Sequence, residues 1–199
     1  MWQAVRTLFE PFAWYDRARW LTNFGVFSGP IAAALRAGPG ERVLDIGCGT
    51  GTYSEIVPGD YVGLDPDVRR VRYARRRHGT DRHTFEKGWV GDAYQLFGRK
   101  SFHKTLIVNV LHHLGDDECR HLLRLVAELT RGRLVVVDAD RARANRWQRI
   151  LLDRVPGHFI RSEAELGHLV RSEFQILRTT RFTTVSHSVP LFVFVCEPL

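Results

Sequence analysis

Three glycines at alternate positions, Gly47, Gly49 and Gly51, follow the acid Asp45 in this chain of 199 residues. Glycine lacks a Cβ and adopts positive φ angles freely, so a turn of this kind lets a ligand lie close to the backbone. The spacing is G-x-G-x-G, which differs from the G-x-G-x-x-G typical of dinucleotide sites. A carboxylate before the turn would repel a pyrophosphate, but it suits a ligand that carries an ammonium and a sulfonium group. The residues therefore predict a nucleotide-type site for a ligand with positive charge.

A second acid, Asp65, comes twenty residues after Asp45 and ends the apolar run Tyr-Val-Gly-Leu. In doubly wound nucleotide-binding folds, an acid about 20 residues further on accepts hydrogen bonds from the ribose hydroxyls. Pro66 follows and suits the first position of a helix, so the alternative is that Asp65 only caps that helix. We favour the ribose role because the glycine turn lies just upstream.

These residues need a regular framework to bring them together. Residues 43–46 are apolar and β-prone and predict a buried parallel strand, and residues 50–57 can start a short helix whose amides face the same space. Strand and helix patterns then alternate through residues 41–138, as in α/β folds. The other expected strands are 61–65, 84–88, 104–111, 134–138, 174–185 and 191–196. The other expected helices are 29–36, 66–78, 116–130, 140–154 and a segment to Val170 opened by the capping box Ser162-x-x-Glu165, besides amphipathic segments within residues 2–24.

Over Val43–Gly51, which reads Val-Leu-Asp-Ile-Gly-Cys-Gly-Thr-Gly, the chain resembles the class I S-adenosylmethionine-dependent methyltransferases. We expect a single α/β domain over residues 1–199, a Rossmann-like, doubly wound and mostly parallel seven-stranded sheet with an antiparallel closing strand and N-terminal helices. Its expected parts are a helical cap (1–40), a cofactor-binding core (41–138) and a substrate-side segment with the closing strands (139–199). The resemblance implies S-adenosyl-L-methionine as cofactor and S-adenosyl-L-homocysteine as product.

The resemblance also implies residue roles. In the family an acid after the third strand bonds the adenine amino group, and Asp92 matches it; Tyr15, in the pair Tyr15-Asp16, looks like the aromatic residue that reaches the methionine end. Asn109 and Val110 would lie at the carboxyl end of the fourth strand, in the crevice where the strand order reverses. The cofactor set is thus Tyr15, Asp45, Gly47, Cys48, Gly49, Asp65, Pro66, Asp92, Ala93, Asn109 and Val110, with Asp45 supporting the glycine turn and Cys48 filling a position where a small residue suffices.

A proton acceptor is needed if the methyl group goes to a hydroxyl or an acid, and histidine suits that task near neutral pH. His112, at the mouth of the fourth strand, and His158, after the fifth, are the candidate general bases. The alternative for His112 is packing or helix entry, the role that its His-His pair often has in relatives. We predict no metal site, because Cys48, Cys119 and Cys196 are scattered and form neither a C-x-x-C zinc pattern nor a disulfide framework.

Two differences between this sequence and the motifs of related methyltransferases narrow the class of methyl acceptor. Asn109-Val-Leu-His stands where exocyclic-amine methylases of nucleic acids have Asn/Asp-Pro-Pro-aromatic, and the Pro-Cys of RNA cytosine-C5 enzymes is missing there. Both favour a small organic acceptor. Two alternatives stay open: an RNA methyltransferase that uses the arginine-rich helix 66–78, and a cofactor-binding protein without transfer activity.

The net charge of +7 and the pI near 9.8 could indicate nucleic acid, but all except three of the basic residues are arginine, as a genome-wide arginine bias would also produce. No apolar run approaches the ~20 residues of a membrane span, and the N-terminus does not read as a signal peptide. We expect a cytoplasmic enzyme, with contact between the aromatic N-terminal segment and a membrane surface as a further possibility.

Overall fold

A computed structural model describes residues 25–153, 159–183 and 189–199. The amphipathic segments expected before residue 25 lie outside the described residues. The described chain begins with helix α3 (Gly25–Leu35), which corresponds to the helix expected at 29–36.

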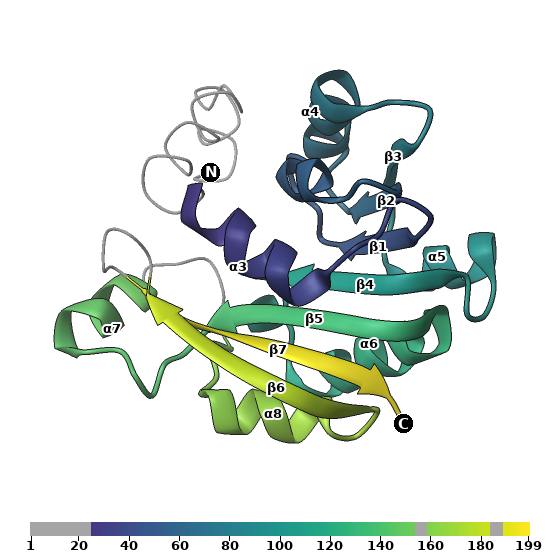
Figure 1. The fold of residues 1–199 in the computed structure, drawn as a ribbon. Coiled ribbons are helices and arrows are strands. Elements are labelled where there is room, and N and C mark those ends of the chain that lie inside the picture. Colours follow the sequence, from purple (N-terminus) through teal and green to yellow (C-terminus); the bar gives the residue numbers. More distant parts are fainter. Residues whose placement is uncertain (1–24, 154–158, 184–188) are drawn as a thin grey trace.

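A seven-stranded sheet forms the centre of the molecule, with strand order β3-β2-β1-β4-β5-β7-β6 (Figure 1). Strands β1 to β5 are parallel, and β7 runs antiparallel between β5 and β6. The predicted fold class is therefore confirmed, including its antiparallel closing strand. The strands are β1 (Arg42–Ile46), β2 (Asp60–Asp65), β3 (His83–Lys87), β4 (Phe102–Val108), β5 (Thr130–Ala139), β6 (Phe174–Thr183) and β7 (Pro190–Pro198).

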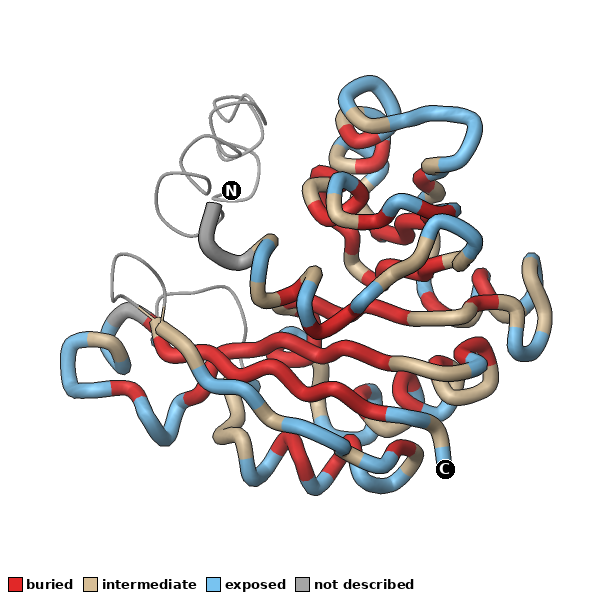
Figure 2. Tube along the Cα trace, in the orientation of Figure 1, coloured by how far each residue is buried: buried red, intermediate tan, exposed pale blue. Residues whose placement is uncertain are grey.

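Helices cover both faces of the sheet and create two buried clusters. Helix α3, the 3₁₀ helix η2 (Thr52–Ile56) and α4 (Val68–His78) pack on one face, and α5 (Val90–Phe97), α6 (Asp116–Leu129) and α8 (Glu163–Val170) on the other. Val43 belongs to the first cluster and Leu44 to the second, as alternate residues of a strand buried on both sides must. Figure 2 shows the central strands buried and β6 largely exposed at the edge.

The strand order reverses between β1 and β4, because the chain passes from β3, at the far edge, back across β1 and β2 to form β4. Parallel strands end at the same edge of a sheet, so the carboxyl ends of β1, β2, β4 and β5 lie together. A crevice at such a switch point is where open α/β sheets bind ligands.

Two expected helices differ from prediction. The segment predicted as a helix from residue 50 to 57 is only the 3₁₀ helix η2, and of residues 140–154 only α7 (Arg146–Leu152) is helical. The start of α7 is delayed because Asn145 and Gln148 cap it reciprocally: the Gln148 N–H donates to Asn145 Oδ1 at 2.9 Å and the Asn145 N–H to Gln148 Oε1 at 2.8 Å. The predicted capping box of α8 is confirmed, since Ser162 Oγ accepts the Glu165 N–H at 3.2 Å.

Candidate active site

The glycine turn is fastened to the end of β2 by hydrogen bonds. The N–H groups of Gly47 and Cys48 donate to the Leu64 carbonyl at 2.8 and 2.9 Å. The Gly49 N–H donates to Asp65 Oδ2 at 2.9 Å, and Asp65 Oδ1 accepts the Asp67 N–H at the same distance. Asp65 is buried, so these donors hold its carboxylate in one position beside the turn.

All three glycines of the turn have positive φ, +71° at Gly47, +57° at Gly49 and +83° at Gly51, but they differ in their surroundings. A Cβ on Gly47 would lie 2.5 Å from Val110 Cγ2, and one on Gly51 would lie 2.6 Å from the Phe85 ring. A Cβ on Gly49 would meet nothing within 4 Å. Packing thus accounts for the outer two glycines, while Gly49, although buried, has unfilled space beside its backbone, as a nucleotide cradle requires.

Among the described residues, the carboxylate that bonds the glycine turn is that of Asp65, and the support expected from Asp45 stays a prediction. The Asp45 carboxylate accepts a hydrogen bond from the Tyr61 hydroxyl at 2.5 Å and is only 1% exposed. Burial raises the pKa of Asp45 to about 7; the Tyr61 hydrogen bond opposes this rise and the negative charge of Asp65 adds to it. A cation at the turn would favour the ionised form of this acid.

The other predicted cofactor residues of the first half lie around the same edge. Asp92 is exposed in the first turn of α5, where its Oδ2 accepts the Trp89 N–H at 2.7 Å, and Ala93 beside it is buried in the core. Pro66 is exposed directly after β2. Cys48 is buried against Gly63, and burial raises the pKa of its thiol well above the usual value, which fits a packing role rather than a nucleophile.

At the end of β4 the chain turns sharply towards the glycines. Asn109 has a φ of +56°, its N–H donates to the Val137 carbonyl at 2.9 Å, and its side chain forms no hydrogen bond with the described residues. Val110 comes next and fills the space beside Gly47. The structure therefore brings the end of β4 against the glycine turn.

His112 pairs with Asp138, the penultimate residue of β5. His112 Nδ1 lies 2.7 Å from Asp138 Oδ1, and the His112 backbone N–H donates to Asp138 Oδ2 at 3.1 Å. Asp138 Oδ1 also accepts the Ala139 N–H at 2.8 Å, and both side chains are more than nine-tenths buried. A carboxylate next to Nδ1 places the imidazole proton there, which leaves Nε2 able to accept a proton. No described residue bonds Nε2.

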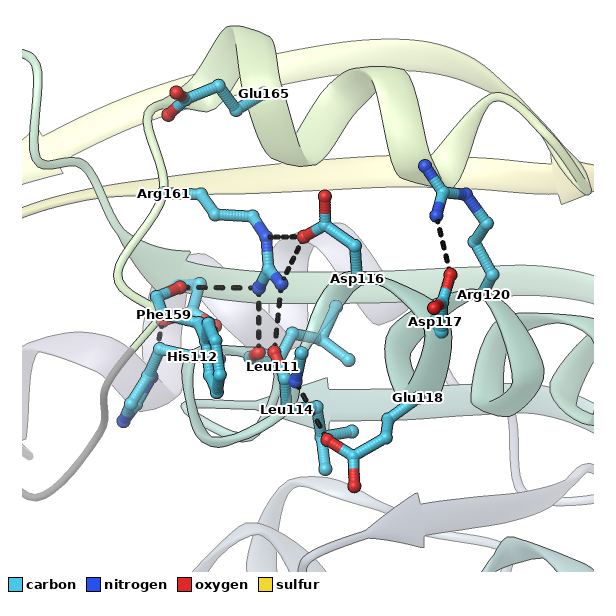
Figure 3. Close-up of polar contacts among 12 residues, drawn as sticks. Leu111, His112, Leu114, Asp116, Asp117, Glu118, Arg120, Phe159, Arg161 and Glu165 are labelled. Atoms are coloured by element: carbon cyan, nitrogen blue, oxygen red, sulfur yellow. Dashed lines mark hydrogen bonds and ion pairs between the residues drawn. The ribbon is translucent and has the colours of Figure 1, made fainter.

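The loop that carries His112 is held from outside by Phe159 and Arg161 (Figure 3). The Phe159 N–H donates to the His112 carbonyl at 3.1 Å. The Arg161 guanidinium donates to the carbonyls of Leu111 at 3.0 Å and Leu114 at 2.8 Å and pairs with Asp116 at 2.6 Å. In Figure 3 the tip of the His112 ring points away from this clamp. Because one guanidinium bonds two carbonyls of the loop as well as Asp116, Arg161 has a structural role here.

Sequence reasoning missed three of these partners, and two predicted residues cannot be placed. Asp138 was recognisable only as an acid ending a strand, and neither Tyr61 nor Arg161 carried any signal. Tyr15 and His158 lie outside the described residues. Among the described residues, no group of three or more histidines, cysteines and acids could hold a metal ion.

Comparison with known proteins finds a methyltransferase domain model that matches part of the chain. Residues 43–133 match a family model described as a methyltransferase domain. The sequence matches no curated protein. Magnesium protoporphyrin IX methyltransferase from Synechocystis PCC 6803 with bound SAH has a similar fold: 20% identity, a TM-score of 0.70, and 99% of both chains covered.

Two further solved structures share the fold. Geranyl diphosphate methyltransferase in complex with GPP and sinefungin is 13% identical with a TM-score of 0.71, covering 87% of this chain and 78% of that one. The [4+2]-cyclase SpnF is 15% identical with a TM-score of 0.69, covering 86% and 80%. The family match over residues 43–133 and the shared fold, together with the glycine turn and its acids, support a class I methyltransferase that uses S-adenosylmethionine as its cofactor.

Proposed function

We propose that the protein transfers the methyl group of S-adenosylmethionine to a small organic acceptor whose reacting atom carries a proton, a hydroxyl above all. The observation that carries this proposal is the buried pair of His112 and Asp138, 2.7 Å apart. His112 comes two positions after Val110, the residue packed beside Gly47, so the pair lies close to the glycine turn in the sequence of contacts.

The residues of the β1–β2 half fit the cofactor. Asp65 would accept the ribose hydroxyls, since each of its oxygens has a lone pair left beyond the one backbone donor that it already accepts. Gly49 offers open backbone for the methionine end, Asp92 an exposed carboxylate for the adenine amino group, and Tyr15 remains a predicted contact. When bound, the cofactor supplies a methyl group already activated by a positively charged sulfur.

The protein then has to remove the acceptor's proton. Asp138 holds the Nδ1–H of His112 and would stabilise the imidazolium formed when Nε2 takes that proton, the arrangement that histidine–aspartate pairs use in hydrolases. A carboxylic acid is already ionised near neutral pH and gains little from such a base, whereas a hydroxyl gains much. The pair therefore favours hydroxyl acceptors.

The test is a panel of phenols, alcohols, carboxylic acids, amines and sugars, with formation of S-adenosylhomocysteine as the readout. We expect product with a hydroxyl acceptor, and about 10²- to 10⁴-fold lower turnover for His112→Gln at unchanged cofactor affinity. The exposed neighbour His113 gives the matched control, since His113→Gln should stay within a few-fold of wild type. Undiminished turnover of His112→Gln would contradict the role of the base, and tight cofactor binding without product from any acceptor would favour a protein without transfer activity.

An RNA acceptor is the second candidate, and one observation favours it. Arg72, Arg76 and Arg77 are exposed on α4 and form no ion pair with the described residues, whereas Arg69 and Arg75 pair with Asp67 and Glu86. Binding to RNA that weakens by about 10³- to 10⁵-fold between 50 and 200 mM salt would support this candidate.

A further inference from the structure

Helix α7 presents large apolar side chains to solvent. Trp147 is 77% exposed, and Ile150, three residues on and so on the same side of the helix, is 39% exposed. The opposite side of the segment is anchored, because Ala144 and Leu152 are buried in the cluster beneath α3. The outward position of Trp147 is thus fixed by packing, and an exposed apolar patch of this kind marks an interaction surface.

Arginines that pair with no acid of the described residues surround these side chains. Arg143 and Arg146 are exposed and form no hydrogen bond or ion pair through their side chains with the described residues. Among the described residues, the Arg149 side chain donates only to the Ala144 carbonyl, at 3.0 Å. The nearby Asp153 is already paired with Arg141 at 2.8 Å. The surface made by Arg143, Arg146, Trp147, Arg149 and Ile150, which we call the α7 patch, therefore combines an apolar centre with uncompensated positive charge.

This combination distinguishes α7 from the other arginine-rich helix, α4. On α4, the apolar residues Val71 and Ala74 are buried in the core. No aromatic residue of α4 is as exposed as Trp147, so the arginines of α4 that form no ion pair with the described residues have no exposed aromatic side chain among them. Binding of a polyanion requires only the positive charges of such arginines. A tryptophan amid arginines is suited to the interface of an anionic bilayer, where the ring lies at headgroup depth and the guanidinium groups meet phosphates.

A second copy of the chain is a poor occupant for the α7 patch. A two-fold contact of the patch with itself would set three arginines against three arginines, and like charges across an interface oppose association. We propose that the α7 patch docks the protein on anionic membrane surfaces. Because α7 follows β5 and lies beside the end of β6 (Figure 1), docking would bring the edge of the sheet that carries the active site close to the bilayer.

The experiment is co-sedimentation of the full chain with vesicles of phosphatidylcholine alone and of phosphatidylcholine mixed with phosphatidylglycerol. We expect binding to the mixed vesicles only, and at least a tenfold lower partition coefficient for Trp147→Ala and for the double variant Arg143→Glu/Arg146→Glu. Because the arginines supply attraction to the anionic headgroups, the binding should be reversed by salt. Among the described residues none forms a helix long and apolar enough to cross a membrane.

Two controls separate the patch from general properties of the chain. Trp89→Ala removes another tryptophan, 52% exposed at the start of α5, and Arg72→Glu/Arg76→Glu makes the same charge change on α4. Both should leave the partition coefficient within a few-fold of wild type. The proposal fails if wild type does not bind the mixed vesicles or if Trp147→Ala binds them like wild type. It also fails if the double arginine variant of α4 loses as much binding as the double arginine variant of α7. Self-association that Trp147→Ala abolishes would overturn it in favour of a second copy. None of these results depends on methyl transfer, so they are independent of the proposed function.

Discussion

Each half of the carboxyl edge of the sheet holds a buried aspartate, but the two have different kinds of partner. In the β1–β2 half, Asp65 accepts hydrogen bonds from the backbone N–H groups of Gly49 and Asp67, which cannot change their charge. In the β4–β5 half, Asp138 faces the ring of His112, which can gain and lose a proton. The difference suggests a division of labour in which the first half binds and the second reacts.

The largest effect should come from removing the carboxylate of the β1–β2 half that is proposed to bind the cofactor. Asp65→Ala removes the acceptor proposed for two ribose hydroxyls, so the Kd for S-adenosylhomocysteine should rise by about 10²-fold or more. Asp60→Ala is the matched control, because Asp60 lies on the same strand but pairs with Arg82 at the surface and should leave the Kd unchanged. Isothermal titration calorimetry measures both, with thermal unfolding to show that the variants fold.

A smaller effect is expected from weakening the reacting half. Asp138→Asn keeps the shape of the side chain but loses the charge that would stabilise a protonated His112, so kcat should fall by about 10²-fold. KM and the cofactor Kd should not change. Asp140→Asn alters another buried aspartate two residues on, whose contacts are the N–H groups of Ala142 and Glu163, and kcat should stay within a few-fold. Equal losses in the two variants would mean that Asp138 is merely structural.

A third effect concerns stability rather than binding or turnover, and it involves Asp45, an acid of the first half whose charge is not fixed. Its pKa is raised from 3.8 to about 7 by burial, so the folded state holds this proton more tightly than the unfolded chain does. Its contribution to stability is therefore fully present below about pH 4, declines as the pH rises towards about 7, and is constant above. The free energy of unfolding of wild type relative to Asp45→Asn should fall by a few kcal/mol across this range, as measured by urea titrations. A difference independent of pH would show that Asp45 is not protonated in the fold.

The meeting of the glycine turn with Asp65 could be predicted from the sequence because its signals are local. Asp45, the glycines and Asp65 lie within a single strand–turn–helix–strand segment, and their spacing reflects the geometry of that segment. Even there, the hydrogen bond between Asp45 and Tyr61 was not predictable, because Tyr61 lies beside Val43 only once β1 and β2 pair.

The reacting half depends on contacts between distant segments. His112 was predicted as a candidate base, but its partner lies 26 residues away on a neighbouring strand, and its loop is held by Arg161, about 50 residues away. Register between β4 and β5 decides which acid meets the histidine, and a pattern of apolar residues does not determine register to that accuracy. The delayed start of α7 has a similar cause, since a pair of polar side chains decides it.

The most direct test of this division of labour is calorimetry with S-adenosylhomocysteine on wild type, Asp65→Ala and His112→Gln, with turnover measured on the same samples. We predict that His112→Gln binds like wild type although it turns over slowly, and that Asp65→Ala binds weakly. The account would be contradicted if wild type did not bind S-adenosylhomocysteine, or if Asp65→Ala bound it as tightly as wild type.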